Sequence, residues 1–126
     1  MRYNRMRTGK YRSGLEDKIA KSLEDRNVKV LYETTKLRYT KPITNHTYTP
    51  DFVLPSGIII EAKGLFSSAD RKKHLLVQEQ HPRLDIRFVF SSSRKKLYKG
   101  AKTTYGDWCT QHRFVYADKD IPKEWL

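Results

Sequence analysis

The order of secondary-structure patterns along this sequence predicts an α/β fold in which helices flank a mixed β-sheet. Two observations support the prediction. A run of strand-like segments follows one amphipathic helical segment, and the later strand-like segments are separated by helical ones. Strands that follow each other directly can pair antiparallel, whereas strands joined through a helix lie parallel. A sheet with both kinds of pairing is therefore expected.

The first helix is predicted from Gly14 to Arg26. Ser13 and Glu16 have the spacing of a capping box, apolar residues then recur at helical intervals, and Asn27 is a plausible stop. On this pattern alone, Glu16 has a structural role at the helix start. The pattern does not decide whether Glu16 also reaches a metal ion.

Most of the segment from residue 28 to residue 63 is predicted to form strands, because the hydrophobic period changes there to about two. Residues 28–33 and 37–39 alternate apolar with polar side chains, and residues 41–49 lack apolar periodicity, so we expect an extended connection there and no packed element. The segment TPDFVLPSGIIIEAKG then predicts a hairpin of residues 51–54 and 58–63.

The last third of the chain alternates helices and strands. A helix capped by Ser67 or Ser68 should end near Gln80, before Pro82. The expected elements that follow are a buried strand at 84–90, a basic loop at 91–102, a short helix at 104–112 and a strand at 114–116.

Composition indicates a partner and a compartment. The 126 residues suffice for one domain, and 26 basic against 14 acidic residues give a net charge of +12, which is typical of proteins that bind nucleic acid. The sequence has no apolar run long enough for a membrane span, no signal-peptide pattern and no phosphate-binding glycine loop, so neither a membrane nor a nucleotide cofactor is expected. A single cysteine, Cys109, favours an intracellular protein and a small buried apolar side chain.

The predicted hairpin brings charged side chains together. With residues 55–57 as a three-residue loop and Gly57 in the left-handed conformation, Asp51 lies opposite Glu61, and Lys63 shares their face. Two carboxylates this close raise one pKa unless a cation lies between them. Mg²⁺ prefers such oxygen ligands, and Lys63 is placed to hold a water molecule or to stabilise negative charge. The sequence therefore predicts metal-assisted phosphodiester hydrolysis.

A plainer interpretation of Glu61 and Lys63 is a solvated ion pair at the end of a strand, which contributes about 0 to 1 kcal/mol. The isoleucines before Glu61 argue against it, since an unpaired acid beside a buried apolar run costs several kcal/mol.

Other charged residues are assigned by their grouping. Three basic groups are expected to contact DNA phosphates, although a solvated surface is the alternative. The first group lies on an arm at residues 1–12, which is expected to be mobile: Arg2, Arg5, Arg7, Lys10 and Arg12. The second lies on the second helix: Arg71, Lys72 and Lys73. The third lies on the basic loop: Arg94, Lys95, Lys96, Lys99 and Lys102. The four histidines lack zinc-site spacing and are predicted to be polar surface residues or to face DNA: His46, His74, His81 and His112.

Several segments together resemble the endonuclease I family of short-tailed bacteriophages, which are Holliday-junction resolvases with a restriction-endonuclease-like fold. They are RSGLEDK, NHTYTPDF, EAKGL, DRKKHLL, EQHP, LDIRFVFSSSRKKLYKG and IPKEWL. The Pro-Asp and Glu-x-Lys signature of these nucleases falls on Pro50, Asp51, Glu61 and Lys63. Family members commonly continue past IPKEWL with a basic tail, so we expect either a naturally short form or a trimmed chain.

The resemblance implies a site shared between two chains. It implies that Asp51, Glu61 and the Ala62 carbonyl hold one Mg²⁺ or Mn²⁺, that Asp51 and Glu16 hold a second, and that Lys63 is catalytic. Glu16 would then come from the partner of a segment-swapped homodimer, with residues 36–45 as the bridge and 13–126 as the nuclease domain.

The implied function is cleavage of four-way and other branched DNA junctions by paired cuts that leave 5′-phosphate ends, in the cytoplasm of an infected bacterium. A non-catalytic DNA-binding module and a sequence-specific restriction-type endonuclease are the alternatives.

Overall fold

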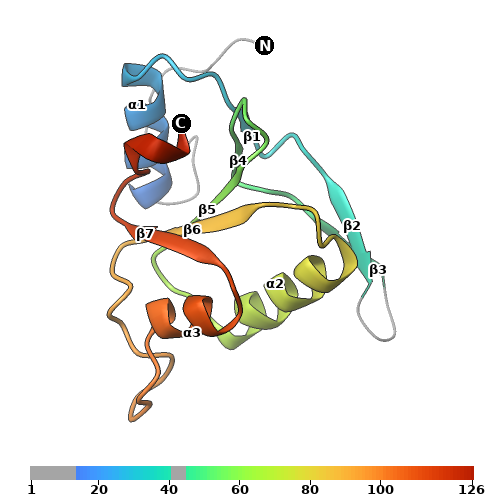
Figure 1. Cartoon of the computed structure of the whole chain (residues 1–126), viewed down its shortest axis with the longest axis vertical. Coiled ribbons are helices and arrows are strands. Elements are labelled where there is room, and N and C mark those ends of the chain that lie inside the picture. Colours follow the sequence, from blue (N-terminus) through green and yellow to red (C-terminus); the bar gives the residue numbers. More distant parts are fainter. Residues whose placement is uncertain (1–13, 41–44) are drawn as a thin grey trace.

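A five-stranded mixed sheet is the central element of the computed structural model, which describes residues 14–40 and 45–126 (Figure 1). Its strand order is β1-β4-β5-β6-β7. The strands are β1 (Leu31–Tyr32), β4 (Phe52–Val53), β5 (Ile59–Lys63), β6 (Ile86–Phe90) and β7 (Val115–Asp118). β1, β4 and β5 pair antiparallel, and β5, β6 and β7 pair parallel through helical crossovers. The predicted mixed sheet is confirmed.

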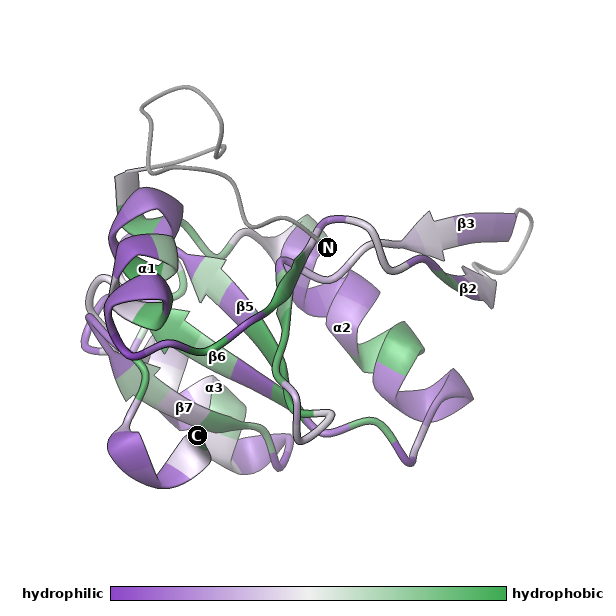
Figure 2. Ribbon diagram, turned by 90° about the horizontal axis from the view of Figure 1, so that it is seen from above, coloured by the Kyte–Doolittle hydropathy of each residue, from purple (hydrophilic) through white to green (hydrophobic). Residues whose placement is uncertain are grey.

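Helices cover both faces of this sheet. The helix α1 (Gly14–Asp25) packs on one face with the C-terminal 3-10 helix η1 (Lys123–Trp125), and α2 (Ser68–Gln80) and α3 (Tyr105–Gln111) pack on the other. Figure 2 shows apolar residues concentrated in the strands between these two layers. None of the helices in the described residues is long and apolar enough to cross a membrane.

The helix boundaries follow from local capping. Past the end of α1, Asn27 adopts a left-handed φ of 58°, and the Val28 N–H donates to the Leu23 carbonyl at 2.9 Å, which closes a Schellman motif. Ser67 and Thr104 cap α2 and α3 in capping boxes with Asp70 and Asp107. The three helices therefore match their predicted positions; Ser13 lies outside the described residues.

A separate two-stranded sheet corrects one prediction. β2 (Leu37–Thr40) pairs antiparallel with β3 (Asn45–Tyr48), so residues 45–48 form a strand where an unpaired extended connection was expected. The buried Tyr39 and Tyr48 join this ribbon to the core, and the Gln80 side chain of α2 accepts the Thr40 N–H at 2.6 Å. Strand β3 has three polar residues followed by one buried tyrosine, which is too weak a signal to identify the strand from sequence.

Strand β5 passes through the centre of the molecule. Ile60 belongs to the apolar cluster under α1, and Ile59 belongs to the aromatic cluster under α2 and α3. Both faces of β5 are thus buried at its start, and the strand continues directly into Glu61 and Lys63. The charged residues are carried by one of the most firmly packed segments of the fold.

Candidate active site

The hairpin of β4 and β5 has the predicted register. Phe52 pairs with Ile60 and Val53 with Ile59. The Leu54 N–H donates to the Ile58 carbonyl at 2.9 Å, and Gly57 takes a φ of 94° in the turn. The same register, carried one residue beyond the last pair, places Asp51 opposite Glu61, as the sequence predicted.

Asp51 and Glu61 are joined through the backbone. The N–H of Asp51 donates to Oε2 of Glu61 at 3.1 Å, and Oδ2 of Asp51 accepts the N–H of Ala62 at 2.9 Å. Glu61 is only 2% exposed, so it is not part of a solvated surface pair. The plainer interpretation of the Glu-x-Lys segment is therefore wrong for Glu61.

Lys63 lies between two carboxylates. Its Nζ is 3.7 Å from Oε1 of Glu61 and 3.7 Å from Oδ1 of Asp70, and its side chain is 15% exposed. Asp70 thus combines its helix-capping role with an ion pair that sequence reasoning missed. These contacts hold the ammonium group between Glu61 of the hairpin and Asp70 of α2.

Two further acids approach Asp51 from the N-terminal part of the same chain. Carboxylate oxygens of Glu16, Glu33 and Asp51 all lie within 4.8 Å of one another. Glu16 is buried, and its Oε1 accepts the Tyr32 hydroxyl at 3.0 Å, so its carboxylate is held inside the fold beside Asp51. The position of Glu33 near Asp51 was not predicted. In a regular strand its side chain would point to the face opposite to that of Tyr32, but its φ of 52° interrupts this alternation.

The two hairpin acids differ in their pKa values. Burial, together with the carboxylates of Glu61 and Glu16, raises the pKa of Asp51 to about 9. Burial also opposes ionisation of Glu61, but His74, Lys63 and the Tyr48 hydroxyl outweigh it and lower the pKa of Glu61 to about 2. As predicted, one pKa of the pair is raised, and a cation near Asp51 would offset the crowding that raises it.

His74 corrects the prediction that it is a surface or DNA-facing residue. Its side chain is fully buried in α2, with Nε2 3.6 Å from Oε1 of Glu61. Burial lowers its pKa, which favours the neutral imidazole. Spacing gave no signal for His74 because its neighbour Glu61 belongs to another element. The other three histidines are partly exposed.

Cys109 is buried, as predicted. Burial raises the pKa of its thiol to about 12, so Cys109 is not a nucleophile near neutral pH.

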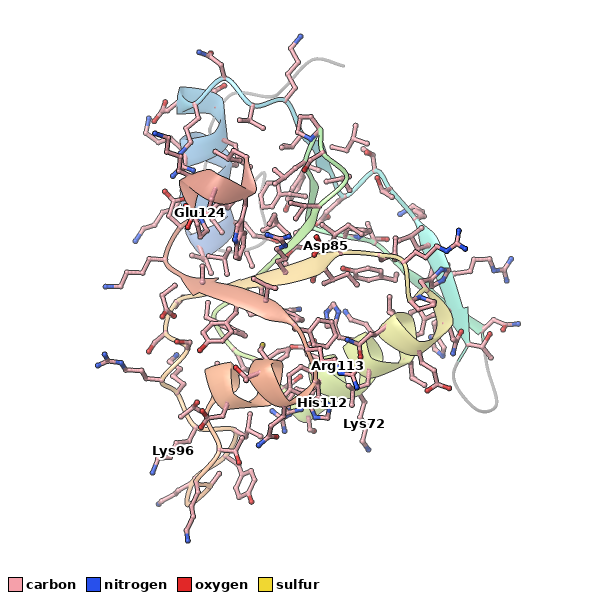
Figure 3. The ribbon with its side chains drawn as sticks, viewed as in Figure 1. Lys72, Asp85, Lys96, His112, Arg113 and Glu124 are labelled. Atoms are coloured by element: carbon pink, nitrogen blue, oxygen red, sulfur yellow. The ribbon has the colours of Figure 1, made fainter. Side chains whose placement is uncertain are left out.

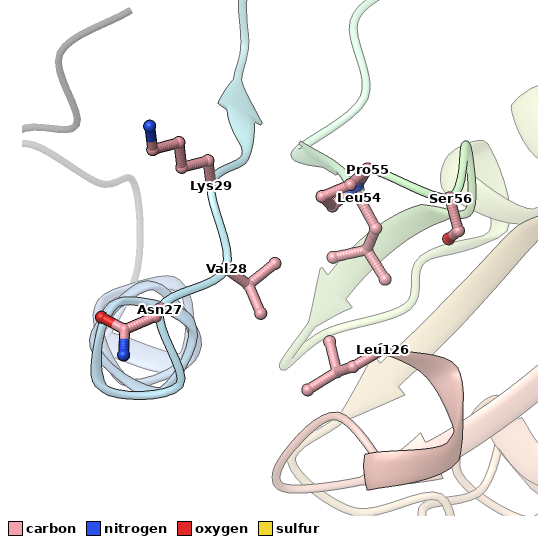
Figure 4. Close-up of a pocket in the computed structure, with 7 residues that line it drawn as sticks. All are labelled: Asn27, Val28, Lys29, Leu54, Pro55, Ser56 and Leu126. Carbon is pink, nitrogen blue, oxygen red and sulfur yellow. The ribbon is translucent and has the colours of Figure 1, made fainter.

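The acids open into a polar pocket of about 340 Å³. Its lining residues are Glu33, Lys36, Thr47, Thr49, Asp51, Glu61, Lys63 and Lys73. A second pocket of about 350 Å³ is mainly apolar, with Val28, Leu54 and Leu126 among its lining residues (Figure 4). The second pocket has no acidic side chain among its lining residues, whereas the first offers the grouped carboxylates that phosphodiester chemistry needs.

The predicted DNA-contacting residues do not all lie at this pocket. Lys73 lines it, whereas the Arg71 guanidinium donates to the Phe66 carbonyl at 2.7 Å. Lys72 and the loop residue Lys96 are exposed and directed outward (Figure 3). The other predicted loop residues are exposed as well: Arg94, Lys95, Lys99 and Lys102. Arg2, Arg5, Arg7, Lys10 and Arg12 lie outside the described residues.

A basic α/β protein whose sheet presents grouped carboxylates beside a lysine has the features of a metal-assisted phosphodiesterase. The chain belongs to the phage endonuclease I family, whose sequence model matches residues 1–126. It is 60% identical to Endonuclease I of Escherichia phage T7 over 120 residues, which are 95% of this chain and 80% of that protein. It is 61% identical to Endodeoxyribonuclease 1 of Enterobacteria phage T3 over 112 residues, 89% of this chain and 74% of that protein. The names of both relatives describe endonucleases, the class of hydrolase that the site indicates.

Proposed function

We propose that this chain is a structure-selective DNA endonuclease that resolves four-way and other branched junctions by metal-dependent phosphodiester hydrolysis. The observation that carries the proposal is the convergence of Asp51, Glu61 and Lys63 on one face of a buried hairpin, beside Glu16. Family membership supports DNA as the substrate and phage infection of a bacterium as the setting, which gives the host cytoplasm as its place of action.

The carboxylates fit a hard divalent cation. Glu16, Glu33 and Asp51 offer oxygen ligands within 4.8 Å of one another, and the raised pKa of Asp51 reflects the repulsion that a cation would relieve. Asp51, Glu61 and the Ala62 carbonyl would hold one Mg²⁺ or Mn²⁺, and Asp51 with Glu16 a second. When bound, these ions supply Lewis-acid activation of the phosphodiester and of water.

The side chains of the chain itself orient the reaction. Lys63 is held between Glu61 and Asp70, where its ammonium group can position the attacking water or stabilise charge on the phosphate oxygens. Water loses a proton as its oxygen bonds to phosphorus, the bond from phosphorus to the 3′-oxygen breaks, and the 3′-oxygen takes up a proton. The products carry a 5′-phosphate and a 3′-hydroxyl.

We further propose a segment-swapped homodimer in which Glu16 from one chain completes the partner's site. Along the sequence, Glu16 lies before residues 36–45 and Asp51 lies after them. Residues 36–45 therefore connect the segment that carries Glu16 to the segment that carries Asp51, and the site brings these two residues together. The ends of this connection belong to the β2–β3 ribbon, which lies outside the main sheet (Figure 1). Two sites related by a two-fold axis would explain paired cuts in two strands.

Cleavage of a four-way junction in Mg²⁺ tests the catalytic proposal. Glu61→Gln and Lys63→Ala should abolish cuts while anisotropy in Ca²⁺ still detects junction binding, and Lys123→Ala, an exposed change in η1, should cut normally. Cutting by both site variants at the wild-type rate would contradict the proposal. Binding by a wild-type protein that never cuts would indicate a binding module, and cuts at fixed sequences in linear duplex would indicate a restriction-type enzyme.

Mixed chains test the shared site. A heterodimer of Glu16→Ala and Asp51→Ala chains has one intact site if Glu16 crosses between chains, and none if each chain closes on itself. Recovery of single-strand nicking after the two inactive proteins are unfolded and refolded together supports the swap. Inactivity of heterodimers isolated by two different tags would contradict it.

A further inference from the structure

We infer that His74 and Tyr48 are positioning residues that fix the orientation of the Glu61 carboxylate toward its ion and substrate. The inference rests on the proposed function, because it assigns these two side chains a role in the same site. Neither residue is expected to touch the reacting phosphate. They act by restricting how Glu61 can turn.

The contacts of Glu61 are divided between its two oxygens. Oε2 accepts the Tyr48 hydroxyl at 2.8 Å and the Asp51 N–H at 3.1 Å. Oε1 lies 3.6 Å from Nε2 of His74 and 3.7 Å from Nζ of Lys63. Rotation of the carboxylate would break contacts at both oxygens, so one orientation is selected before any ion binds.

His74 is chemically out of place unless it serves Glu61. Its ring is fully buried and meets Tyr48 and Phe88 edge to face, with centroids 5.4 and 4.9 Å away. Neither ring nitrogen has a hydrogen-bond partner among the described residues, and a buried polar group without one costs about 1 to 3 kcal/mol. A phenylalanine would suit this aromatic shell without that cost, so packing does not explain the imidazole.

The carboxylate of Glu61 explains the presence of an imidazole at position 74 better than packing does. Nε2 is 3.6 Å from Oε1 of Glu61, which is longer than a hydrogen bond of about 2.7 to 3.2 Å. A shift of about 0.5 Å would bring the two atoms within hydrogen-bonding distance. A neutral imidazole with its proton on Nε2 can donate to the carboxylate without adding a charge to a site that already holds Lys63. Tyr48 supplies the matching donor to the other oxygen.

His74→Phe and Tyr48→Phe test the inference, because each keeps an aromatic side chain of similar size and removes the donor. We expect both variants to remain folded when metal-free, which thermal unfolding checks, because each keeps an aromatic ring in the shell around the site. Mn²⁺ affinity of the DNA-free protein, measured by calorimetry, should fall roughly 10- to 100-fold in each variant. The maximal cleavage rate in Mg²⁺ should fall as well, with junction binding in Ca²⁺ unchanged. His74→Gln, which keeps an N–H donor, should recover part of the Mn²⁺ affinity.

The outcomes separate this inference from the proposed function. If the wild type binds Mn²⁺ and cuts junctions, and both phenylalanine variants do so equally well, His74 and Tyr48 are packing residues and the inference is wrong. If one or both lose affinity while remaining folded, the inference stands for the residue affected. A wild-type protein that neither binds Mn²⁺ nor cuts would overturn the proposed function itself, and this inference with it.

Discussion

Asp51 donates its backbone N–H to the side chain of Glu61, with 3.1 Å between the nitrogen and Oε2. The contact extends the hairpin one pair beyond the last ladder position, Phe52 with Ile60, and sets two carboxylic acids against each other. Their environments then diverge: the pKa of Asp51 is raised to about 9 and that of Glu61 lowered to about 2. In the metal-free protein near pH 7, Glu61 is therefore ionised and Asp51 protonated, from which two predictions follow.

Replacing Asp51 by asparagine should stabilise the metal-free protein. An aspartate with a raised pKa contributes stability that is present below its usual pKa of 3.8 and is lost as the pH rises toward about 9. Asparagine does not titrate, so the gain should grow between pH 5 and pH 8, to about 1 to 3 kcal/mol. Thermal unfolding in EDTA at these pH values measures it, with the exposed Asp25→Asn as control. A gain that shrinks with rising pH would contradict the assignment.

Ion binding should release a proton from Asp51. A ligand carboxylate must be deprotonated, so a group with a pKa of about 9 loses its proton when Mn²⁺ binds at pH 7, whereas Glu61 has none to lose. The apparent Mn²⁺ affinity should rise about tenfold per pH unit between pH 6 and pH 8. Calorimetry in buffers of different ionisation enthalpy should count close to one proton per site. A value near zero would mean that Asp51 is already ionised.

The sequence was sufficient to predict the hairpin because pairing rules are local. One glycine turn sets the register, and Asp51, Glu61 and Lys63 lie where that register places them. Glu33 and His74 could not be found this way. Glu33 enters the site because its backbone takes a left-handed φ, and His74 because α2 packs its buried face against β5. Both depend on tertiary packing, which residue spacing does not encode.

Glu33→Gln should weaken ion binding at the site. The change removes a charge from the cluster of Glu16, Glu33 and Asp51 but keeps the side-chain length and the backbone conformation, whose φ is 52°. We expect roughly a tenfold loss of Mn²⁺ affinity with little change in unfolding temperature. Glu79→Gln, on the exposed part of α2, is the matched control and should bind Mn²⁺ normally. Equal affinities for the two variants would remove Glu33 from the set of ligands.

The basic loop before α3 should contribute to DNA affinity through charge alone. Bonds from the Leu97 N–H to the Thr103 carbonyl and from the Ala101 N–H to the Tyr98 carbonyl order this loop, while Lys95 and Lys96 are exposed on it. If 6 to 10 phosphates are contacted in all, junction affinity should fall by roughly 10³ to 10⁵ between 50 and 200 mM salt.

Changing both loop lysines to glutamine should reduce the slope of log affinity against log salt by about 2, since each phosphate contact contributes about 1. Anisotropy titrations with a four-way junction in Ca²⁺ measure that slope. Lys21→Gln with Lys123→Gln is the control, because this pair removes the same charge from α1 and η1, on the other side of the sheet. Equal slopes for the two double variants would show that the loop acts only through the net charge of the protein and makes no phosphate contact of its own.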